Sequence, residues 1–333
     1  MNWNGFFCFI FGLLFTQISL HAQYPEEDEA VTYETFFDDP SDINKLYLHI
    51  QPLYGELFMT NVNIGYGFEV DYYLKDLFDF NINFRKTYSR KFDFIRDVAE
   101  KNSQVLNDTR RFYYGEIGVT YHIIDREESS KSKFFLYSDT FKQQKKWETM
   151  VPKYIVAPSK LRRIYGLRVG AASYQSTFDV NRTVKNQGEV ALDTLGGLSV
   201  YSNIMNHGFY IGGLLKLIRN VTINFDEIYQ QVTNDMIFST YLDLLIFPFT
   251  TVDDMNFPGT DVGMILSNEI IITNMLGIRA GINGRFNRDF SFGYNIEMGY
   301  RPGIKGQNFY FMGKLSFPLI GLLLKKSNPQ DNE

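Results

Sequence analysis

The chain has 333 residues, of which 17% are aromatic, and its mean hydropathy is -0.20. Its net charge of -5 argues against a nucleic-acid partner, because binding to nucleic acid favours a basic surface. No apolar run reaches the roughly 20 residues that a membrane-spanning helix needs. Cys8 is the only cysteine, so the sequence offers neither a disulfide nor a cysteine-based metal site.

Residues 1–22 have the organisation of a secretory signal peptide. An apolar core at 6–15 is followed by polar residues and by Leu20-His21-Ala22, a suitable cleavage site. Residues 1–5 contain no Lys or Arg, so only the terminal amine supplies positive charge there. A buried or anchoring helix is the alternative, but the apolar core is too short to span a bilayer, which favours export.

Residues 23–44 differ from the rest of the chain in their charge. They contain no Lys or Arg, and their acidic residues are Glu26, Glu27, Asp28, Glu29, Glu34, Asp38, Asp39 and Asp42. Such runs are usually solvated, so we predict a flexible N-terminal segment. A calcium site or a docking peptide is the alternative, although no EF-hand spacing is present.

The clearest pattern runs from Asn61 to Tyr88. Every second residue from Val62 to Leu74 is apolar or aromatic, and the residues between them are polar or small until Tyr73. After Lys75-Asp76 the same alternation resumes, and a period of two indicates β-strands. The arms of 14 and about 12 residues exceed the usual soluble strand of about 5–6. Long alternating strands with an aromatic face are typical of a transmembrane β-barrel.

Similar alternation predicts further strands along the chain. We place them at 45–54, 110–123, 161–174, 207–217, 221–228, 235–247, 262–272, 276–286, 290–300 and 309–317. The stretch 196–206 fits either a strand or a loop, and both interpretations give about 12 strands, within a range of 10 to 14. We expect 207–217 and 221–228 to form a hairpin, and Asp243 to be the one inward charge of its strand.

Residues 124–160 interrupt the pattern with charged and polar residues. They are too long for an ordinary turn, so we expect an insertion that is either a small folded element or a partner-binding segment. The tight Lys75-Asp76 turn resembles a periplasmic turn, which would place 124–160 in the periplasm and the polar stretches 91–108 and 176–194 outside. Pro318 lacks an N–H and is predicted to end the last strand.

Over roughly residues 45–320 the chain resembles Gram-negative outer-membrane β-barrel proteins. The resemblance rests on the exported N-terminus, the amphipathic strands, the alternation of short turns with longer loops, and the aromatic final strand Gly313-Lys314-Leu315-Ser316-Phe317. It implies an all-β, antiparallel up-and-down barrel in the outer membrane, surrounded by outer-membrane lipid. The polar tail at 321–333 departs from the family pattern, in which the last strand often ends the chain with an aromatic residue. No motif assigns a named family.

Charged residues of both signs are expected to face the barrel interior. They are Glu69, Asp71, Asp79, Arg85, Glu116, Arg168, Arg279, Arg285 and Glu297. One interpretation is a polar channel lined by these residues. The other is a salt-bridged interior that packs the barrel shut, and a barrel near 12 strands lies between the filled 8-stranded and the open 16-stranded types.

Catalysis finds little support in the sequence. Without residues 1–22 the chain has three histidines, His49, His122 and His207, and the odd spacing of Ser202 and His207 places them on opposite strand faces. No GxSxG, HExxH, P-loop or zinc spacing is present. We therefore expect no catalytic residue, cofactor or metal.

The resulting functional prediction is a channel or transport protein of unassigned substrate. The alternative is a non-conducting structural or accessory subunit of an outer-membrane secretion or assembly complex, which would dock an envelope protein through 124–160 or the acidic N-terminus.

Overall fold

The structure is a computed structural model, and it describes residues 33–74, 77–136, 153–188, 198–225, 231–257, 265–288 and 292–322. The predicted signal peptide at 1–22, the first part of the acidic segment and nearly all of the predicted tail at 321–333 lie outside the described residues. No helix in the described part of the chain is long and apolar enough to cross a membrane.

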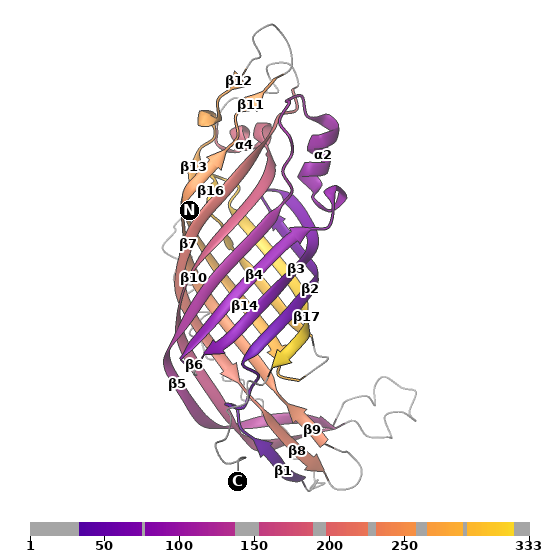
Figure 1. Cartoon of the computed structure of the whole chain (residues 1–333), viewed down its shortest axis with the longest axis vertical. Coiled ribbons are helices and arrows are strands. Elements are labelled where there is room, and N and C mark those ends of the chain that lie inside the picture. The colour runs from indigo at the N-terminus through magenta and orange to yellow at the C-terminus, as the bar shows by residue number, and fades with distance from the viewer. Residues whose placement is uncertain are drawn as a thin grey trace, which may run out of the picture. The chain divides into compact units, whose positions relative to one another are not determined.

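Ten antiparallel strands close into an up-and-down barrel, in which each barrel strand pairs with the next one along the chain (Figure 1). They are β2 (Leu46–Phe58), β3 (Asn61–Leu74), β4 (Phe78–Thr87), β5 (Tyr113–Leu136), β6 (Lys153–Asp179), β7 (Tyr201–Ile218), β10 (Met236–Val252), β14 (Leu276–Phe286), β15 (Gly293–Tyr300) and β17 (Phe309–Leu322). β17 pairs with β2 and closes the ring. The predicted all-β, antiparallel up-and-down barrel is confirmed, with a strand number at the low end of the predicted range.

The predicted hairpin between 207–217 and 221–228 is wrong. β7 pairs instead with β10. β8 (Val221–Phe225) leaves the barrel and forms a separate three-stranded sheet with β1 (Tyr33–Asp38) and β9 (Gln231–Asn234). Both faces of β8 are covered, since Val221, Thr222 and Ile223 are all buried. In the sequence, however, apolar Val221 and Ile223 alternate with polar Thr222 and Asn224 as in a barrel strand, so the pattern alone could not distinguish the two.

The predicted strand at 262–272 is also wrong. In the described part of this stretch only β12 (Ile265–Leu266) is a strand, and it pairs with β11 (Met255–Asn256). A 3-10 turn, η4 (Asn268–Ile270), follows it. The two misassigned segments account for the difference between about 12 predicted strands and the ten observed.

β5 and β6 continue well beyond the barrel as a two-stranded arm, comprising 124–136 of β5 and 153–161 of β6. Their pairing extends as far as Leu136 and Lys153, so the prediction that the strands end at Ile123 and resume at Leu161 is wrong. A register shift between His122 and Ile124 marks a β-bulge, which changes the phase of the alternation. Residues 137–152 lie outside the described residues.

The predicted flexible segment at 23–44 is wrong for its described part. Residues 33–38 form β1, and Asp38 accepts hydrogen bonds from the backbone N–H of Lys160 in the arm at 2.9 and 3.1 Å. The three-stranded sheet and the arm lie at the same end of the barrel in Figure 1. We call this the arm end.

Residues 39–44 cross the arm end of the barrel from β7 to β2, which lie on opposite sides of the ring. The backbone N–H of Asp39 donates to the carbonyl of Asn220, just after β7, at 3.1 Å. The backbone N–H of Asn44 donates to Oδ1 of Asn287, just after β14, at 2.9 Å. Ile43 lies between these anchors and is only 1% exposed.

The last strand does not end at Pro318, contrary to the prediction. β17 runs to Leu322, and its register with β2 shifts between Leu315 and Phe317 and again between Pro318 and Ile320. Irregular pairing on both sides of the proline accommodates the missing N–H donor.

Short elements gather at the opposite end, which we call the α2 end (Figure 1). They are η1 (Arg90–Phe92), α2 (Phe94–Asn102), α4 (Val180–Asn186), and the strand pairs β11–β12 and β13 (Thr273–Asn274)–β16 (Gly303–Ile304). Thus 91–108, predicted as a loop, contains a helix, and 176–194 begins with the end of β6 and α4.

Asp93 caps α2 and ties it to the barrel rim. Its carboxylate accepts hydrogen bonds from Nδ2 of Asn61 at 2.8 Å and from the backbone N–H of Phe112 at 3.1 Å and of Arg96 at 3.4 Å. Burial raises the pKa of the Asp93 carboxyl above its usual value, because desolvation disfavours the charged form.

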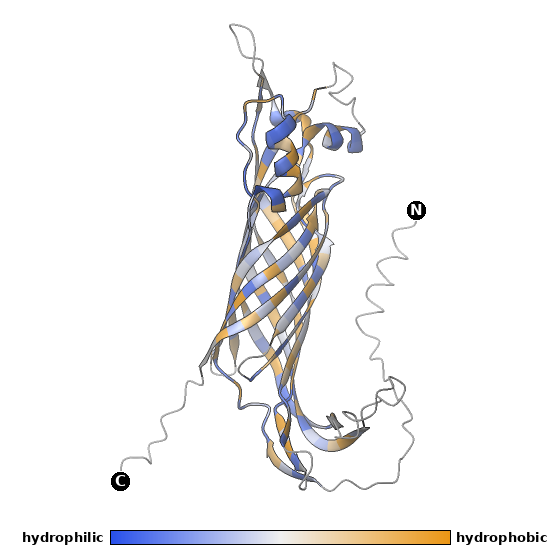
Figure 2. Ribbon diagram, turned by 90° about the vertical axis from the view of Figure 1, so that its right-hand side faces the viewer, coloured by the Kyte–Doolittle hydropathy of each residue, from blue (hydrophilic) through white to orange (hydrophobic). Residues whose placement is uncertain are grey.

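Along the barrel strands, apolar side chains point outward and polar side chains point inward, as the sequence predicts. In β3, Val62 and Phe68 are each 42% exposed, whereas Asn63 and Glu69 are buried. Figure 2 shows apolar and polar residues alternating along the barrel wall. Every barrel strand presents a large apolar residue outward, for example Leu53, Phe68, Ile82, Ile117, Val169, Ile211, Leu244, Leu276, Met298 and Phe311. The outer surface is therefore apolar around the whole ring.

Candidate functional site: the charged interior of the barrel

The nine charged residues predicted to face inward all lie inside the barrel. None is more than 9% exposed, and they are Glu69, Asp71, Asp79, Arg85, Glu116, Arg168, Arg279, Arg285 and Glu297. Asp243, predicted as the one inward charge of its strand, is also buried there, and the structure adds four residues that were not predicted, Glu56, Lys216, Arg301 and Lys314. All fourteen form ion pairs inside the barrel, in several groups that we together call the charged network.

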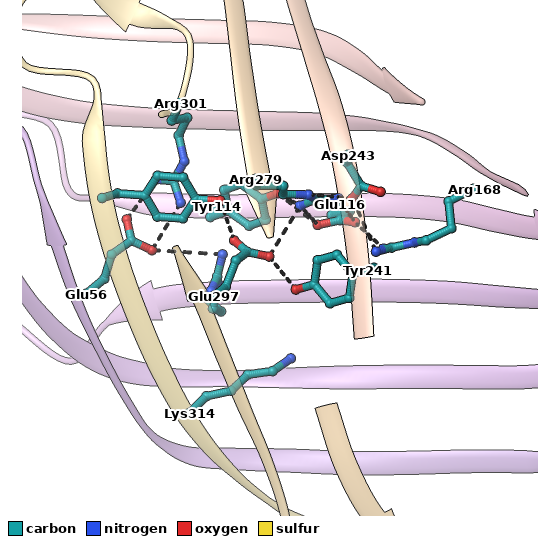
Figure 3. Close-up of polar contacts among 12 residues, drawn as sticks. Glu56, Tyr114, Glu116, Arg168, Tyr241, Asp243, Arg279, Glu297, Arg301 and Lys314 are labelled. Carbon is teal, nitrogen blue, oxygen red and sulfur yellow. Dashed lines mark hydrogen bonds and ion pairs between the residues drawn. The ribbon is translucent and has the colours of Figure 1, made fainter. Parts of the chain in front are cut away.

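Arg279 on β14 occupies the centre of this network (Figure 3). Its guanidinium donates to both carboxylate oxygens of Glu116 on β5 at 2.7 Å, and its Nε donates to Asp243 on β10 at 2.7 Å. A third carboxylate, that of Glu297, lies 3.6 Å away. Arg168 completes the cluster, 3.2 Å from Asp243 and 3.6 Å from Glu116. The contact between Arg279 and Glu116 crosses the lumen, since β14 and β5 lie on nearly opposite walls.

Buried tyrosines donate further hydrogen bonds to the carboxylates of Glu116 and Glu297. The hydroxyl of Tyr114 donates to Glu116 at 2.8 Å. The hydroxyls of Tyr241 and Tyr310 donate to the two oxygens of Glu297 at 2.6 and 2.8 Å. Buried carboxylates need such donors, because an ion pair alone rarely compensates for the loss of water.

Buried tyrosine rings also contact the arginine guanidinium groups. The guanidinium carbon of Arg85 lies 4.3 Å from the ring centroid of Tyr114, and that of Arg168 lies 4.1 Å from the centroid of Tyr241. The guanidinium carbon of Arg279 is 4.4 Å from the Tyr210 centroid. Such cation–π contacts are strongest where water is excluded, so these rings fill the lumen and stabilise its charges together.

Toward the α2 end, Glu56 joins two arginines. It accepts hydrogen bonds from Arg301 at 2.7 and 3.3 Å, and Arg85 lies 3.9 Å away. Beyond this pair a large cluster of buried apolar and aromatic side chains, including Phe58 and Phe247, fills the end of the barrel. The lumen is therefore closed by hydrophobic packing at the α2 end.

Toward the arm end, three further ion pairs span the interior. Nζ of Lys314 donates to Glu69 at 2.7 Å. Lys216 pairs with Asp79 and Arg285 pairs with Asp71.

The hydroxyl of Tyr73 links the last two pairs. It accepts from Lys216 at 3.1 Å and from Arg285 at 2.6 Å. A second apolar cluster, in which Ile43 contributes from the crossing segment 39–44, lies below these pairs. Apolar packing therefore bounds the charged network at both ends.

The network carries no net charge. Its cations are Arg85, Arg168, Lys216, Arg279, Arg285, Arg301 and Lys314, and its anions are Glu56, Glu69, Asp71, Asp79, Glu116, Asp243 and Glu297. Every one of them has an opposite charge within 4.0 Å. An interior of this kind selects neither cations nor anions by its net field.

The space left between these side chains is small. A polar cavity of about 70 Å³ lies within the network, lined by residues that include Asn83, Ser239 and Asn295. It is large enough for a few water molecules, each of which needs about 10–15 Å³ by the same measure. It is too small to form a continuous aqueous passage through the barrel.

The residues considered for catalysis do not come together. Ser202 is buried and donates to the carbonyl of Asp253 at 2.6 Å, whereas His207 is exposed on the outer face of the same strand. Within the described ranges there is no group of three or more His, Cys, Asp or Glu residues that could hold a metal ion.

Comparison with known proteins gives no matching family model and no similar curated protein.

Proposed function

We propose that this chain is a closed β-barrel of the outer membrane of a Gram-negative bacterium, and that it serves as a non-conducting structural or accessory subunit of an envelope assembly. The observation that carries the proposal is the neutral, fully paired network of seven cations and seven anions across the lumen.

Insertion in a membrane is supported by the apolar outer surface. Leu53, Ile117, Leu244 and Phe311 are each more than a third exposed, and comparable residues occur on all ten strands. Water-soluble monomers rarely expose apolar patches larger than about 300–600 Å². A continuous apolar ring around a barrel with a polar interior is the arrangement expected in lipid.

The closed state is supported by the energetics of the network. Opening a passage would separate buried charges such as Arg279 and Glu116, and breaking a buried pair costs about 3–5 kcal/mol. It would also displace the apolar cluster around Phe58 at the α2 end. A resting pore is therefore strongly disfavoured by this interior.

A role in an assembly is supported by the structure at the arm end. The described parts of the two segments considered for docking, the acidic N-terminus and 124–160, form one platform there, because β1 is joined to β6 through Asp38 and Lys160. Phe36 of β1 is 68% exposed on this platform. The periplasmic turn predicted at Lys75-Asp76 would place the platform in the periplasm.

The test is to isolate the full chain from its own envelope with gentle detergent. We expect an envelope protein to co-purify, and to be lost when Phe36→Ser is introduced. The matched control is Leu106→Ser, since Leu106 is equally exposed, at 68%, at the α2 end. Isolation of the wild type alone, or equal loss with both variants, would contradict the assembly role.

A channel remains the second candidate, and the polar cavity lined by Asn83 and Asn295 is the observation that favours it. Steady ion conductance through the purified barrel would support this function over the first.

A further inference from the structure

The outer wall of the barrel carries a groove of about 350 Å³ near the α2 end. It spans three neighbouring strands and is lined by Phe84, Lys86, Arg111, Tyr113 and Gln175. Lys86 of β4 is in register with Tyr113 of β5, which is in register with Gln175 of β6. The groove therefore lies on the outer face of the barrel wall, which is also the face that carries the apolar surface.

The groove is positively charged. Lys86 and Arg111 contribute two cations, and none of the lining residues is acidic. Neither cation has a carboxylate within 4.0 Å in the part of the chain that the structure describes. Other rim cations differ, as Arg110 pairs with Asp253 and Arg90 with Glu100.

Along the outer wall, the cations of the groove lie nearest the rim, and apolar residues follow them along the strands. Lys86 and Arg111 lie toward the rim, and Phe84 and Tyr113 lie beside them with ring centroids 6.5 Å apart and nearly parallel. One outward step from Phe84 along β4, and two outward steps from Tyr113 along β5, lead to the registered pair Ile82 and Ile117, which are 41% and 58% exposed. A ligand that is anionic at one end and apolar at the other would match this sequence of contacts.

Small residues leave room for such a ligand. Gly115 is the outward position of β5 between Tyr113 and Ile117, and it is in register with Ser173 of β6. A Cβ added at Gly115 would meet only Phe84, at 3.9 Å, so the position is open without backbone strain. Side chains of ordinary size here would block the path from the cations to the apolar wall.

We propose that this groove binds a phosphate-bearing anionic lipid, with the headgroup on Lys86 and Arg111 and an acyl chain over Gly115 and Ile117. The inference rests on the proposed membrane location. The lysine ammonium and the arginine guanidinium are both strong donors to phosphate oxygens, and basic residues beside a membrane attract anionic headgroups.

The experiment measures lipid affinity of the purified full chain in detergent micelles by native mass spectrometry. Phosphatidylglycerol is compared with phosphatidylcholine of the same acyl chains. We expect the wild type to prefer phosphatidylglycerol, and Lys86→Gln with Arg111→Gln to weaken its binding by roughly tenfold or more, since each cation near an anionic headgroup contributes roughly fivefold.

Two further variants make the result specific. Arg182→Gln with Lys185→Gln removes the same charge from exposed positions on α4, and we expect it to leave the affinity unchanged. Gly115→Leu keeps the charge and fills the path, so it should also weaken binding. Circular dichroism confirms that each variant is folded.

Equal affinity for the two lipids, or equal loss with the α4 variant, would overturn the proposal. Competition by glycerol phosphate at the same concentration as the lipid would assign the site to free phosphate instead, and would also overturn it. Flotation of the wild type with liposomes separately tests membrane insertion. A chain that does not float but retains the selectivity would contradict the proposed function and leave the groove's specificity standing.

Discussion

Arg279 is the residue on which the interior depends most. Its side chain is 1% exposed and lies within 4.0 Å of three carboxylates, those of Glu116, Asp243 and Glu297. Each carboxylate would lose compensation if the guanidinium were removed, because buried charges depend on their partners. The strand period alone predicts that Arg279 faces inward, but it could not identify Glu116, on the nearly opposite wall, as its partner.

We expect Arg279→Gln to lower the free energy of unfolding by about 3–5 kcal/mol, because it leaves buried carboxylates undercompensated. Arg279→Lys should be milder, since it retains the charge and loses only the bidentate geometry. The measurement is denaturant unfolding in detergent, with the exposed Lys101→Gln as the control that changes little. Equal stability of Arg279→Gln and the wild type would show that the network does not hold the barrel together.

Glu56 shows why part of the interior could not be predicted. The register between β2 and β3 shifts between Gln51 and Tyr54, which reverses the alternation along β2. A strict period of two from Gln51 onward would place Glu56 outside, whereas it is 2% exposed in the lumen. Lys314 was predictable, because continuing the alternation of Phe311 and Leu315 places it inside.

The contribution of Asp93 to stability is expected to depend on pH. Its folded pKa is raised by burial above the unfolded value of about 4, so its contribution to stability is fully present below pH 4. That contribution is lost as the pH rises through the folded pKa. We therefore expect the amide of Ile95, which donates to Asn61, to be better protected from hydrogen exchange at pH 4 than at pH 7.

The control for this prediction is Asp93→Asn, which cannot ionise and should show no such pH dependence after correction for intrinsic exchange rates. Lower protection of Ile95 at pH 4 in the wild type alone would contradict the prediction, because it would mean that ionisation favours the folded rim.

At the scale of elements, the arm of β5 and β6 is the largest departure from the sequence prediction. The bulge at His122 and Ile124 leaves Ile123 and Ile124 both exposed, so the alternation changes phase within one continuous strand. The hairpin from Asn61 to Thr87 was predictable because no bulge interrupts its register. The pairing of β8 with β1 could not be predicted, because the two strands are far apart in the chain and neither sequence alone identifies its partner.

We expect the barrel to close without the outer part of the arm. Its closure depends on pairs such as β4 with β5 up to Tyr121 and β6 with β7 from Arg162. Replacing residues 130–159 by an Asn-Gly turn joins the registered partners Ser129 and Lys160. Hydrogen exchange should show that the ten strands stay protected, while β1 and β8 become less protected.

The control for the arm replacement is a chain with Asn-Gly inserted after Phe257, in the short elements at the α2 end, which should leave β1 and β8 unchanged. Loss of protection throughout the barrel on shortening the arm would show that the arm is needed for closure, contrary to the expectation.

At the scale of the whole molecule, the chain combines an apolar outer surface with a charged interior that is neutral and paired. The composition predicted a β-barrel, because alternation allows aromatic residues outside and polar residues inside at a mean hydropathy of only -0.20. Whether the lumen was open could not be predicted, since the same inward charges line a pore or neutralise one another. The ion pairs and the apolar clusters around Phe58 and Ile43 favour closure.

Conductance of the full chain in planar bilayers tests the closed barrel most directly. Insertion is first established by flotation with liposomes, so that a silent bilayer cannot be attributed to missing protein. We predict that the inserted barrel gives no steady ion current at moderate voltage, because its cavity of about 70 Å³ holds only a few waters. Steady unitary currents carried by the inserted wild type would contradict the account and identify the barrel as a channel.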